Sequence, residues 1–401
     1  MESQPITYNP FTPGYFADPY PHYAELRAHN PAHFTRFGFL LLCGQSHVLE
    51  AYEHPKLSRD PRGWDGFAES RRDSVDGPLE CMMANWLAMI DPPRHTALRA
   101  AHERAFTADL MTGATGAITA IVADLLDSAL SDGGMDVVGQ FADKLPVYLI
   151  NHLLGLPVED SDRFVAWSRA IAQTAELHNT LKVLQAGRDA LQGMYDYLGP
   201  LVDARRAHPG DDLLSALAGP TAGGETMTRQ EVLDSLIFLY KAGHLTTTNL
   251  ITLGVLTLLR NPRQWDRLQA DRSLLPNAIE EIQRYDGPTQ MTDRVATEDV
   301  EICGLPVRRG QLIRLCLGAV NRDPARHPDP DRFDIDRPSP QHFGFGHGVH
   351  FCVAAALGRL QTRVALAALL DRAPKLRLTD AKLRYLPSVS NRGLVALFVE
   401  F

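Results

Sequence analysis

Apolar residues recur every three or four positions along most of the chain, and this spacing is typical of amphipathic helices. It predicts a first helix over residues 19–29, a second over 91–107 and mostly helical structure over 115–205. The segment 209–217 has the pattern of a turn that leads into a further helix. The chain is therefore expected to be mainly helical.

The longest predicted helix begins at a capping box formed by Thr228 and Glu231 and ends at Arg260, before an Asn-Pro pair. About 30 residues at about 1.5 Å each would span a whole domain. Its middle, residues 241–249, has the sequence KAGHLTTTN, in which glycine and three β-branched threonines are poor helix formers. This weak stretch predicts a local opening that frees carbonyls and hydroxyls for a ligand, or a notch where another element packs.

Strand-like patterns are fewer and shorter. The apolar run FGFLLLCG, at 37–44, has the length of a buried strand, and residues 301–320 and 385–401 have the pattern of strands and hairpins. We expect β-rich portions at about 30–60, 290–320 and 375–401. The predicted class is mainly α with a smaller β portion (α+β), in a single domain over 1–401, because no linker or internal repeat divides the sequence.

Composition narrows the class of protein. The 401 residues are 45% hydrophobic and 22% charged, as in an ordinary globular protein, and the formal net charge of −8 argues against a nucleic-acid partner. Five widely spaced cysteines are expected to be reduced thiols in a cytoplasmic protein. The polar, proline-rich N-terminus offers no membrane anchor and no signal-peptide core, so no membrane association is expected.

The most distinctive chemistry lies at Cys352, which ends the string FGFGHGVHFC. The glycines allow sharp turns and a close approach of a flat molecule to the backbone. An arginine-containing helix is expected to follow, and its N-terminus would favour a thiolate. Such a thiolate suits an axial heme ligand. Two alternatives remain on these residues alone: an inert buried cysteine, or a zinc site that uses His342, His347, His350 and Cys352, although their spacing fits no usual zinc pattern.

With this motif the chain resembles the cytochrome P-450 family of heme-thiolate monooxygenases, in particular the soluble bacterial members. The resemblance extends from Tyr20 to the C-terminus, and the family pattern F-G-x-G-x-H-x-C occurs here as Phe345, Gly346, Gly348, His350 and Cys352. It implies the cytochrome P-450 fold, a triangular helix-rich prism around buried heme b (iron protoporphyrin IX). Ala354 and Gly358 depart from the commonest family residues, but both are small.

The resemblance also implies roles for residues outside the loop. His95 and Arg99 share one helix face, where a solvated surface would be the simpler interpretation, and the family binds heme propionates there. Arg294 and His350 match further propionate contacts. Phe345 is expected near the thiolate, and Glu281, Arg284 and Arg332 match a buried ion-pair triad that braces the cysteine loop.

In the long helix, Ala242, Gly243 and Thr246 match the family's oxygen-binding A-G-x-x-T motif. The family usually places an acid immediately before this threonine, but here the residue is Leu245. Proton delivery through a carboxylate at this position is therefore not expected, and another route or an atypical reaction is implied.

The expected substrate pocket is partly polar. An irregular segment over 60–88, which carries several large apolar residues, either caps this pocket, as in the family, or packs on the core. The pocket candidates are Trp86, Leu239, Thr289, Gln290, Met291, Val389, Ser390 and Asn391. These residues favour a polar or aromatic substrate over a plain hydrocarbon.

The predicted function is oxidation of a small natural product or peptide-like molecule by dioxygen and two electrons in secondary metabolism. The resemblance implies electrons from NAD(P)H through ferredoxin reductase and ferredoxin, with Arg104, Arg359 and Arg363 as contacts for the ferredoxin, and a monomeric cytoplasmic enzyme. Two alternatives stay open: oxidative phenol or aryl coupling without oxygen insertion, and a non-catalytic heme sensor or carrier.

Overall fold

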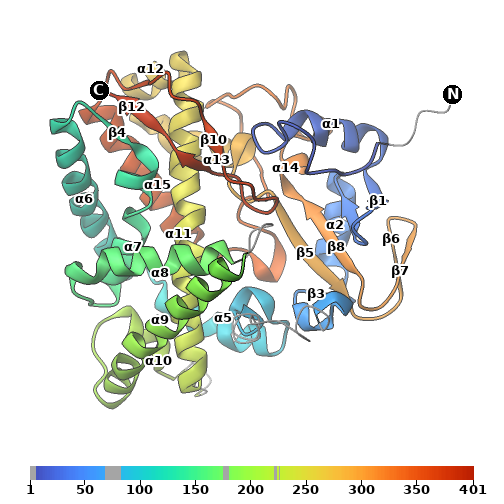
Figure 1. Cartoon of the computed structure of the whole chain (residues 1–401), viewed down its shortest axis with the longest axis horizontal. Coiled ribbons are helices and arrows are strands. Elements are labelled where there is room, and N and C mark those ends of the chain that lie inside the picture. The colour runs from blue at the N-terminus through green and yellow to red at the C-terminus, as the bar shows by residue number, and fades with distance from the viewer. Residues whose placement is uncertain (1–5, 68–82, 175–179, 221–223, 225) are drawn as a thin grey trace. The chain divides into compact units, whose positions relative to one another are not determined.

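The computed structural model describes residues 6–67, 83–174, 180–220, 224 and 226–401 (Figure 1). These residues form two compact units. The first contains residues up to Asp73, Leu256–Cys352 and Leu383–Val395, and the second contains Ser74–Val255, Val353–Lys382 and Ala396–Phe401. Most of the irregular segment expected over 60–88 lies outside the described residues.

The first unit is built on a five-stranded sheet with the order β1-β2-β8-β5-β3. Strand β2 runs parallel to β8, with Leu41 opposite Arg314, and the other neighbouring strands are antiparallel. The sheet strands are β1 (Ala32–Phe34), β2 (Leu40–Leu42), β3 (Leu57–Ser58), β5 (Met291–Ala296) and β8 (Leu312–Cys316). Separate hairpins are formed by β6 (Val300–Ile302) with β7 (Leu305–Val307) and by β10 (Arg384–Tyr385) with β11 (Leu394–Ala396).

Helices α1 (Tyr20–His29), α2 (Gln45–Glu53) and α14 (Leu317–Val320) of the first unit pack apolar side chains against this sheet. The same unit also contains α12 (Pro262–Ala270) and α13 (Leu275–Asp286), with short 3-10 turns at Pro61–Gly63, Arg272–Leu274 and Gly348–His350. Leu40 and Leu42 are fully buried in one apolar cluster, and Leu41 is fully buried in another that includes four tyrosines. The strand predicted from FGFLLLCG is therefore apolar because side chains on both of its faces are buried.

The second unit is helical. Its helices are α5 (Arg94–Ala105), α6 (Ala108–Ser131), α7 (Leu145–Leu153), α8 (Ser161–Gln173), α9 (Leu181–Ala207), α10 (Leu213–Ala218), α11 (Arg229–Arg260, whose last five residues belong to the first unit) and α15 (Ala355–Arg372). Short helical turns occur at Leu87–Met89, Val137–Ala142 and Val158–Asp160, and a small sheet joins β4 (Gly134–Asp136), β12 (Phe398–Glu400) and β9 (Arg377–Leu378). Strand β4 was not expected, because it interrupts a stretch that has mostly helical periodicity.

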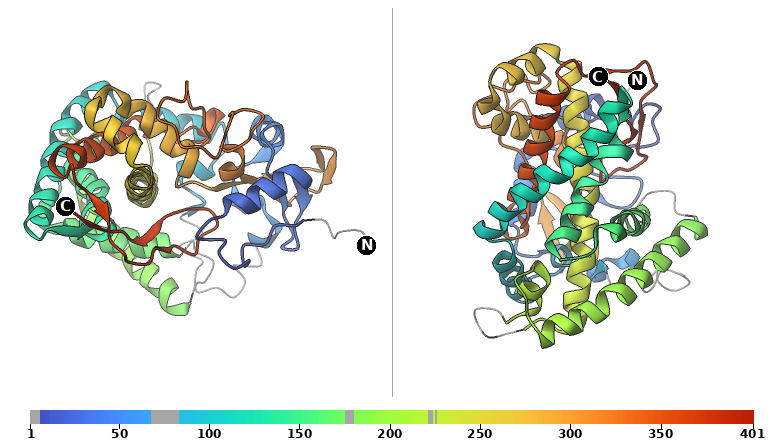
Figure 2. Two further views of the ribbon diagram at one scale, coloured as in Figure 1. Left: turned by 90° about the horizontal axis from the view of Figure 1, so that it is seen from above. Right: turned by 90° about the vertical axis from the view of Figure 1, so that its left-hand side faces the viewer.

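The predicted capping box at the start of α11 is confirmed. The backbone N–H of Thr228 donates to the Glu231 carboxylate at 2.8 Å, and the N–H of Glu231 donates to the Thr228 hydroxyl at 3.2 Å. The two bonds satisfy donors that the first turn of a helix leaves unpaired. Figure 2 shows α11 end-on in one view and along its length in the other, without a visible break.

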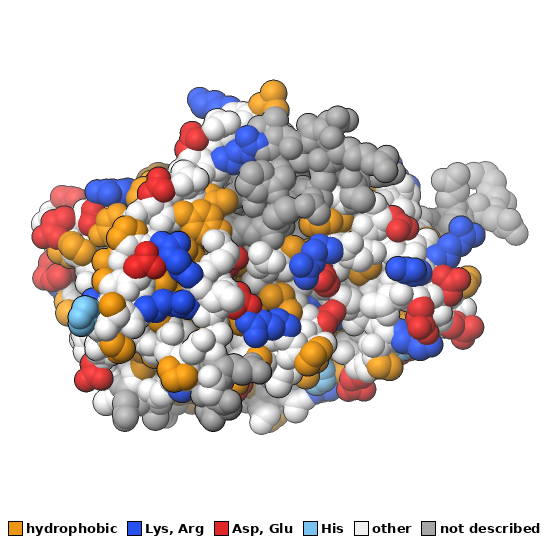
Figure 3. Space-filling model, turned by 90° about the horizontal axis from the view of Figure 1, so that it is seen from below, with side chains coloured by type: hydrophobic (Ala, Val, Ile, Leu, Met, Phe, Trp, Pro, Cys, Tyr) orange, Lys and Arg blue, Asp and Glu red, His pale blue; other side chains and the backbone are white. Residues whose placement is uncertain are grey.

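Two helices, α11 and the segment Leu110–Ser131 of α6, are long and apolar enough to span a membrane by length and composition. In α11, 72% of the most apolar window is buried inside the protein, which is typical of a core helix. On the face drawn in Figure 3, acidic and basic side chains are interspersed rather than gathered by sign. The visible surface therefore gives no sign of a strongly charged docking patch.

Candidate active site

The cysteine loop is shaped by backbone hydrogen bonds within the first unit. The N–H of Cys352 donates to the carbonyl of Phe345 at 2.8 Å, and the N–H of Gly346 donates to the carbonyl of Phe343 at 2.9 Å. Gly346 and Gly348 have φ values of +78° and +66°, a region that glycine adopts without strain. The loop therefore presents the Cys352 thiol at a fixed position, three residues before α15 begins.

Aromatic and polar contacts hold the base of this loop. The ring of Phe343 stacks on Tyr52 with centroids 5.8 Å apart, and its backbone N–H donates to the Asn321 side chain at 2.8 Å. His342 Nε2 lies 3.1 Å from the Glu280 carboxylate. These contacts anchor the loop to α2, α13 and the turn after α14.

The loop fits a heme thiolate better than a bare metal ion. Among the described residues, no group of three or more His, Cys, Asp or Glu side chains is arranged to hold a metal, so the proposed zinc alternative is not supported. His342 is engaged with Glu280 instead. Cys352 is a partly exposed cysteine outside any disulfide, and the neighbouring Val349 and Phe351 are 61% and 40% exposed. One soft ligand on an apolar loop suits a metal whose other ligands come from a macrocycle.

A buried ion-pair group lies beside the loop, and it corrects one prediction. Glu281 and Arg284, both fully buried, form two hydrogen bonds of 2.7 and 2.8 Å. The third member is Arg337, whose Nε lies 3.2 Å from Glu281, and not Arg332. The Arg332 side chain is 67% exposed and pairs with Asp334, while its carbonyl accepts hydrogen bonds from Arg284 and Arg337.

The sequence pattern misled here because two arginines five residues apart flank the same turn. Arg337 also donates to the carbonyls of Pro328 and Asp329, so the turn wraps around its guanidinium. The spacing alone could not show which arginine points inward. The aspartate two residues after Arg332 was the available signal, because it offers that side chain a partner at the surface.

Another predicted residue of the first unit, Arg294, is 4% exposed on β5. Its guanidinium lies 4.8 Å from the centroid of the Tyr52 ring and donates to the carbonyl of Asp293 at 2.8 Å. Burial raises the pKa of the Tyr52 hydroxyl, and the charges of Arg294 and Arg59 partly oppose this rise. Arg294 is therefore a buried cation held close to the cysteine loop through the Tyr52–Phe343 stack.

The two predicted pocket turns meet within the first unit. Thr289 and Asn391 form an isolated β-bridge, and the N–H of Gln290 donates to the carbonyl of Ser390 at 2.8 Å. Gln290 is buried, however, and its amide donates to Tyr20 and to the carbonyl of Gly287. Met291 and Val389 pack in the tyrosine-rich cluster. Gln290, Met291 and Val389 therefore act in core packing in this structure, which weakens their assignment to a pocket.

In the second unit, α5 carries His95 and Arg99 on one face. His95 is 3% exposed, so the solvated-surface interpretation does not hold for it. The Nε of Arg99 donates to Glu103 at 2.7 Å, and the Arg99 side chain is 20% exposed. Arg104, on the same helix, donates to the carbonyls of Ala216 and Gly219 next to α10. It therefore braces α10 and is a poor candidate for contact with a ferredoxin.

The predicted local opening of α11 is not observed. The helix continues through residues 241–249, and the Thr246 hydroxyl donates to the carbonyl of Ala242 at 2.6 Å. Ala242, Gly243, Leu245 and Thr246 are all partly buried, in contrast to the fully buried residues 247–250 that follow. A threonine hydroxyl can bond back to the preceding turn, so the weak helix formers are accommodated without a break.

On another face of α11, Tyr240, His244 and Thr248 follow each other at intervals of four residues and form a buried polar row. His244 Nε2 lies 2.9 Å from Asp143, and His244 Nδ1 lies 3.0 Å from the Ser168 hydroxyl. The Ser168 hydroxyl also donates to the carbonyl of Tyr240 at 3.2 Å. His244 is therefore held between a carboxylate and a hydroxyl from neighbouring segments. Sequence reasoning did not single out His244.

The other two members of the row also bond across to neighbouring helices. The Tyr240 hydroxyl donates to Asn151 at 2.5 Å, and the Thr248 hydroxyl donates to the carbonyl of Ala142 at 3.1 Å. Asp143 additionally pairs with Arg169 of α8. The row thus ties α11 to α7, α8 and the turn before α7 within the second unit.

We expect Asp143→Asn to destabilise the folded protein by roughly 3 kcal/mol at neutral pH, because it removes a buried carboxylate that contacts both His244 and Arg169. Burial alone would raise the pKa of Asp143, but hydrogen bonds and charges from His244 and Arg169 hold this pKa below its usual range. The stabilisation is therefore present above about pH 4 and is lost as the pH falls through the lowered pKa.

Denaturant unfolding of the heme-loaded protein at neutral and acidic pH would measure this effect. Asp162→Asn is the matched control, because Asp162 is an exposed carboxylate in the same unit that contacts Lys144 at 3.8 Å. Equal unfolding midpoints for the two variants at neutral pH would contradict a stabilising role of the Asp143 carboxylate.

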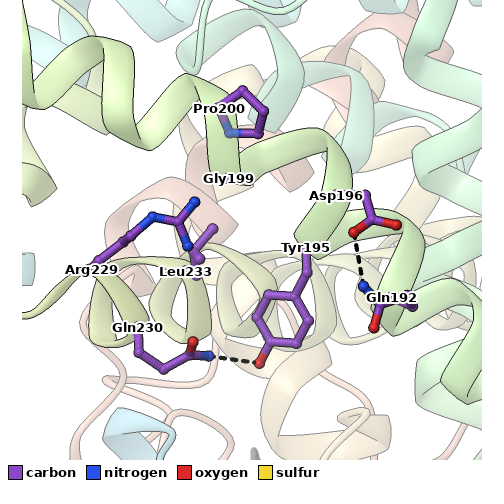
Figure 4. Close-up of a pocket in the computed structure, with 8 residues that line it drawn as sticks. All are labelled: Gln192, Tyr195, Asp196, Gly199, Pro200, Arg229, Gln230 and Leu233. Carbon is purple, nitrogen blue, oxygen red and sulfur yellow. Dashed lines mark hydrogen bonds between the residues drawn. The ribbon is translucent and has the colours of Figure 1, made fainter.

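A surface pocket of about 370 Å³ lies elsewhere in the second unit, between α9 and the first turns of α11 (Figure 4). The Tyr195 hydroxyl donates to Asp234 at 2.6 Å, and Gln230 donates to both residues. Burial raises the pKa of Asp234. None of the predicted site residues lines this pocket, and its polar groups bond mainly to one another. It is therefore not assigned to the active site.

Comparison with known proteins identifies the family. The family model "Cytochrome P-450" matches residues 180–373. PikC, a cytochrome P-450 monooxygenase of Streptomyces venezuelae, is 37% identical over 95% of this chain and 90% of the relative. This chain belongs to the cytochrome P-450 family. It is accordingly a heme-dependent oxidoreductase of the monooxygenase type.

Further similarities agree with this membership. The mycinamicin IV hydroxylase/epoxidase of Micromonospora griseorubida is 39% identical over 79% of this chain and 80% of the relative. The crystal structure of P450BioI with a fatty-acyl-loaded acyl carrier protein has a TM-score of 0.89, is 33% identical and covers 97% of this chain and 100% of that one. The predicted cytochrome P-450 fold and the heme-thiolate class are thereby confirmed.

Proposed function

We propose that this cytochrome P-450 oxidises a small polar or aromatic natural product, or a peptide-like molecule, in secondary metabolism. The main support for the proposed chemistry is the cysteine loop, because its hydrogen bonds hold one thiol in place just before the start of α15. Similar proteins named as a hydroxylase/epoxidase of mycinamicin IV and an epoxidase of cyclomarin C support a natural-product substrate.

Cys352 would bind the heme iron as a thiolate. When bound, the heme supplies activation of dioxygen, and a thiolate ligand favours cleavage of the O–O bond. The basic side chains of His95, Arg99, Arg294 and His350 would neutralise the propionates, and Phe345 would limit the access of water to the sulfur. The buried Glu281 group, through Arg337 and Arg284, would keep the loop in position.

On α11, Ala242 and Gly243 leave room for a small ligand, and Thr246 would pass a proton from its Oγ1. In the structure this hydroxyl donates to the carbonyl of Ala242, so it must rotate before it can donate elsewhere. Leu245 has no proton to supply. Water or the substrate would therefore provide it, which also keeps oxidative phenol or aryl coupling as a second candidate reaction.

The redox chain proposed for this protein runs from NAD(P)H through ferredoxin reductase and ferredoxin, in the cytoplasm, to a monomeric enzyme. Of the three arginines first considered as ferredoxin contacts, Arg363 is exposed and Arg359 is half-buried on α15. Arg363 is the best candidate for contact with the ferredoxin.

The reaction type is tested by incubating the holoenzyme with ferredoxin, ferredoxin reductase, NADH and a library of polar and aromatic natural products. A product heavier by one oxygen atom, with the label of ¹⁸O₂, supports the proposed monooxygenase. Loss of two hydrogens with a new carbon–carbon or carbon–oxygen link would identify coupling. Heme reduction and compound binding without any product would indicate a sensor or carrier.

Leu245→Glu tests whether this position marks an atypical reaction. A proton-donating side chain in the right place is typically worth about 10²–10⁴-fold in rate. If ordinary hydroxylation is the native reaction, the variant should form as much product per NADH as the native protein, or more. If the site suits an atypical reaction, we expect the native product yield to fall.

The measurement is product formed per NADH consumed, after heme content has been matched between the proteins. Leu245→Gln is the control for polarity without an acidic proton. An unchanged ratio and an unchanged product in Leu245→Glu would show that Leu245 has no bearing on the reaction type.

A further inference from the structure

Arg392 is a buried arginine of the first unit that directly follows three of the predicted pocket residues, 389–391. Its side chain is 7% exposed. Its Nε donates to the carboxylate of Asp286 at 2.6 Å, and its Nη1 and Nη2 donate to the carbonyls of Phe16 and Ala17, each at 2.9 Å. Each of the three guanidinium nitrogens therefore donates a hydrogen bond, and one side chain joins the end of α13 to the segment before α1.

The backbone of Arg392 joins the two predicted pocket turns. Its N–H donates to the carbonyl of Pro288 at 2.7 Å, next to the β-bridge between Thr289 and Asn391. The main chain of Arg392 thus holds the two turns together, while its side chain holds them to α13 and to the segment before α1. No other part of the described chain needs to move for a change at this one residue to displace both turns.

The guanidinium of Arg392 is held in one orientation. Burial alone would lower the pKa of Arg392, but the negative charge of Asp286 raises this pKa above its usual value, so the side chain stays charged. Its central carbon lies 4.4 Å from the centroid of the Tyr385 ring and 5.5 Å from that of the Tyr20 ring. A planar cation with three directed hydrogen bonds and two aromatic neighbours has little freedom to reorient.

The pocket candidates on these turns that remain partly open to a ligand are Thr289, Ser390 and Asn391, which are all half-buried. Side chains on a rigidly held turn lose little freedom when a ligand binds, so their placement decides how well a ligand fits. We propose that Arg392 is a positioning residue for the substrate: through its hydrogen bonds it holds these three side chains in the places where they contact it. This inference rests on the proposed function, and it names the group that sets the shape of its pocket.

A buried arginine can also act in stability alone, and Arg322 of the same unit provides the comparison. Arg322 is 8% exposed, and its central guanidinium carbon lies 3.5 Å from the centroid of the Tyr20 ring. Its guanidinium donates to the carbonyl of Tyr285 and to the carboxylate of Asp331. Arg322 is thus as buried as Arg392 and contacts the same aromatic ring, but it lies outside both pocket turns.

The test compares two iron ligands of different size in the ferric holoenzyme. Imidazole reaches the iron with little contact to the pocket, whereas clotrimazole carries three aryl groups that must fit against the pocket wall. Both are titrated by the shift of the Soret band, and the ratio of their dissociation constants cancels any change in the iron itself. We expect the native protein to prefer clotrimazole, and Arg392→Met to reduce this preference about 10-fold. Arg322→Met should leave the ratio unchanged.

Arg392→Lys is a milder change at the same position. Lysine keeps a positive charge beside Asp286, but its ammonium lacks the planar, forked set of donors that serves the carboxylate and the carbonyls of Phe16 and Ala17 together. We expect a change of the ratio in the same direction, with heme content and the ferrous carbonyl spectrum as in the native protein. This variant replaces Arg392→Met in the comparison if the methionine variant does not retain heme.

The inference is overturned if the native protein does not bind clotrimazole more tightly than imidazole, if the ratio is unchanged in Arg392→Met, or if it falls equally in Arg322→Met. Loss of heme from both Arg392 variants would also overturn it, since the residue would then act in general stability. These outcomes are distinct from failure of the proposed function. Oxidised natural products together with an unchanged ratio would refute only the role of Arg392, and a changed ratio without any oxidised product would refute only the proposed oxidation.

Discussion

Cys352→Ser is expected to abolish the red-shifted Soret band of the ferrous carbonyl complex that a thiolate ligand produces. The serine hydroxyl is a harder and less electron-donating ligand than a thiolate, so heme that remains bound should show the spectrum of a nitrogen- or oxygen-ligated protein. Monooxygenase activity should fall to the background, because the thiolate favours O–O cleavage. The measurement is a reduced-carbonyl difference spectrum at matched heme content.

Cys316→Ser and Cys303→Ser are suitable controls, because both cysteines are free and lie on or next to strands of the same unit. Cys303 occupies the turn between β6 and β7, where its backbone N–H donates to Glu50. Both control variants should keep the thiolate spectrum. A native-type spectrum in Cys352→Ser would refute the assignment of the iron ligand.

Arg337→Met and Arg332→Met should differ sharply in stability, although the two arginines are five residues apart. Removal of the Arg337 guanidinium leaves the buried Glu281 with one partner fewer and frees two carbonyls of the turn, so we expect a loss of about 3–5 kcal/mol in the free energy of unfolding. Loss of the exposed Arg332–Asp334 pair should cost under about 1 kcal/mol.

Denaturant unfolding, followed by circular dichroism and by heme release, measures both variants under the same conditions. The Arg337→Met protein should also release heme faster, since Glu281 braces the segment that leads to the cysteine loop. A larger loss of unfolding free energy for Arg332→Met than for Arg337→Met would show that Arg332, the residue predicted from the sequence motif, is the third member of the ion-pair group. Equal losses in the free energy of unfolding would show that neither arginine side chain stabilises the segment before the cysteine loop more than the other.

Local signals in the sequence were sufficient for several elements. The capping box at Thr228 fixed the start of α11 within one residue, because its two hydrogen bonds depend only on residues three apart. The run of leucines at 40–42 gave β2 in the same way. The capping box was predicted because neighbours along the chain supply its hydrogen bonds, and the strand was predicted because an unbroken apolar run of this length is typical of a strand buried on both faces.

Predictions that depended on distant partners were less complete. Strand β4 pairs with β12 at the far end of the sequence, and its own three residues carry no strand pattern. The inward turn of Arg337 depends on carbonyls of residues 328, 329 and 332. The burial of Gln290 depends on a tyrosine 270 positions away. Each of these contacts is set by tertiary packing, which a motif does not encode.

The polar row of Tyr240, His244 and Thr248 has a consequence for engineering this enzyme. The Tyr240 hydroxyl bonds to Asn151 of α7, and His244 and Thr248 bond to the adjacent residues Asp143 and Ala142, so α11 cannot turn about its axis or slide by one residue without breaking all three links. The directions in which the Lys241 and Leu245 side chains point from α11 are thereby set by residues that need not contact a substrate. Libraries aimed at new substrates should therefore randomise Lys241 and Leu245 and preserve the row, since it keeps the scaffold constant while the chemistry of this partly buried face changes.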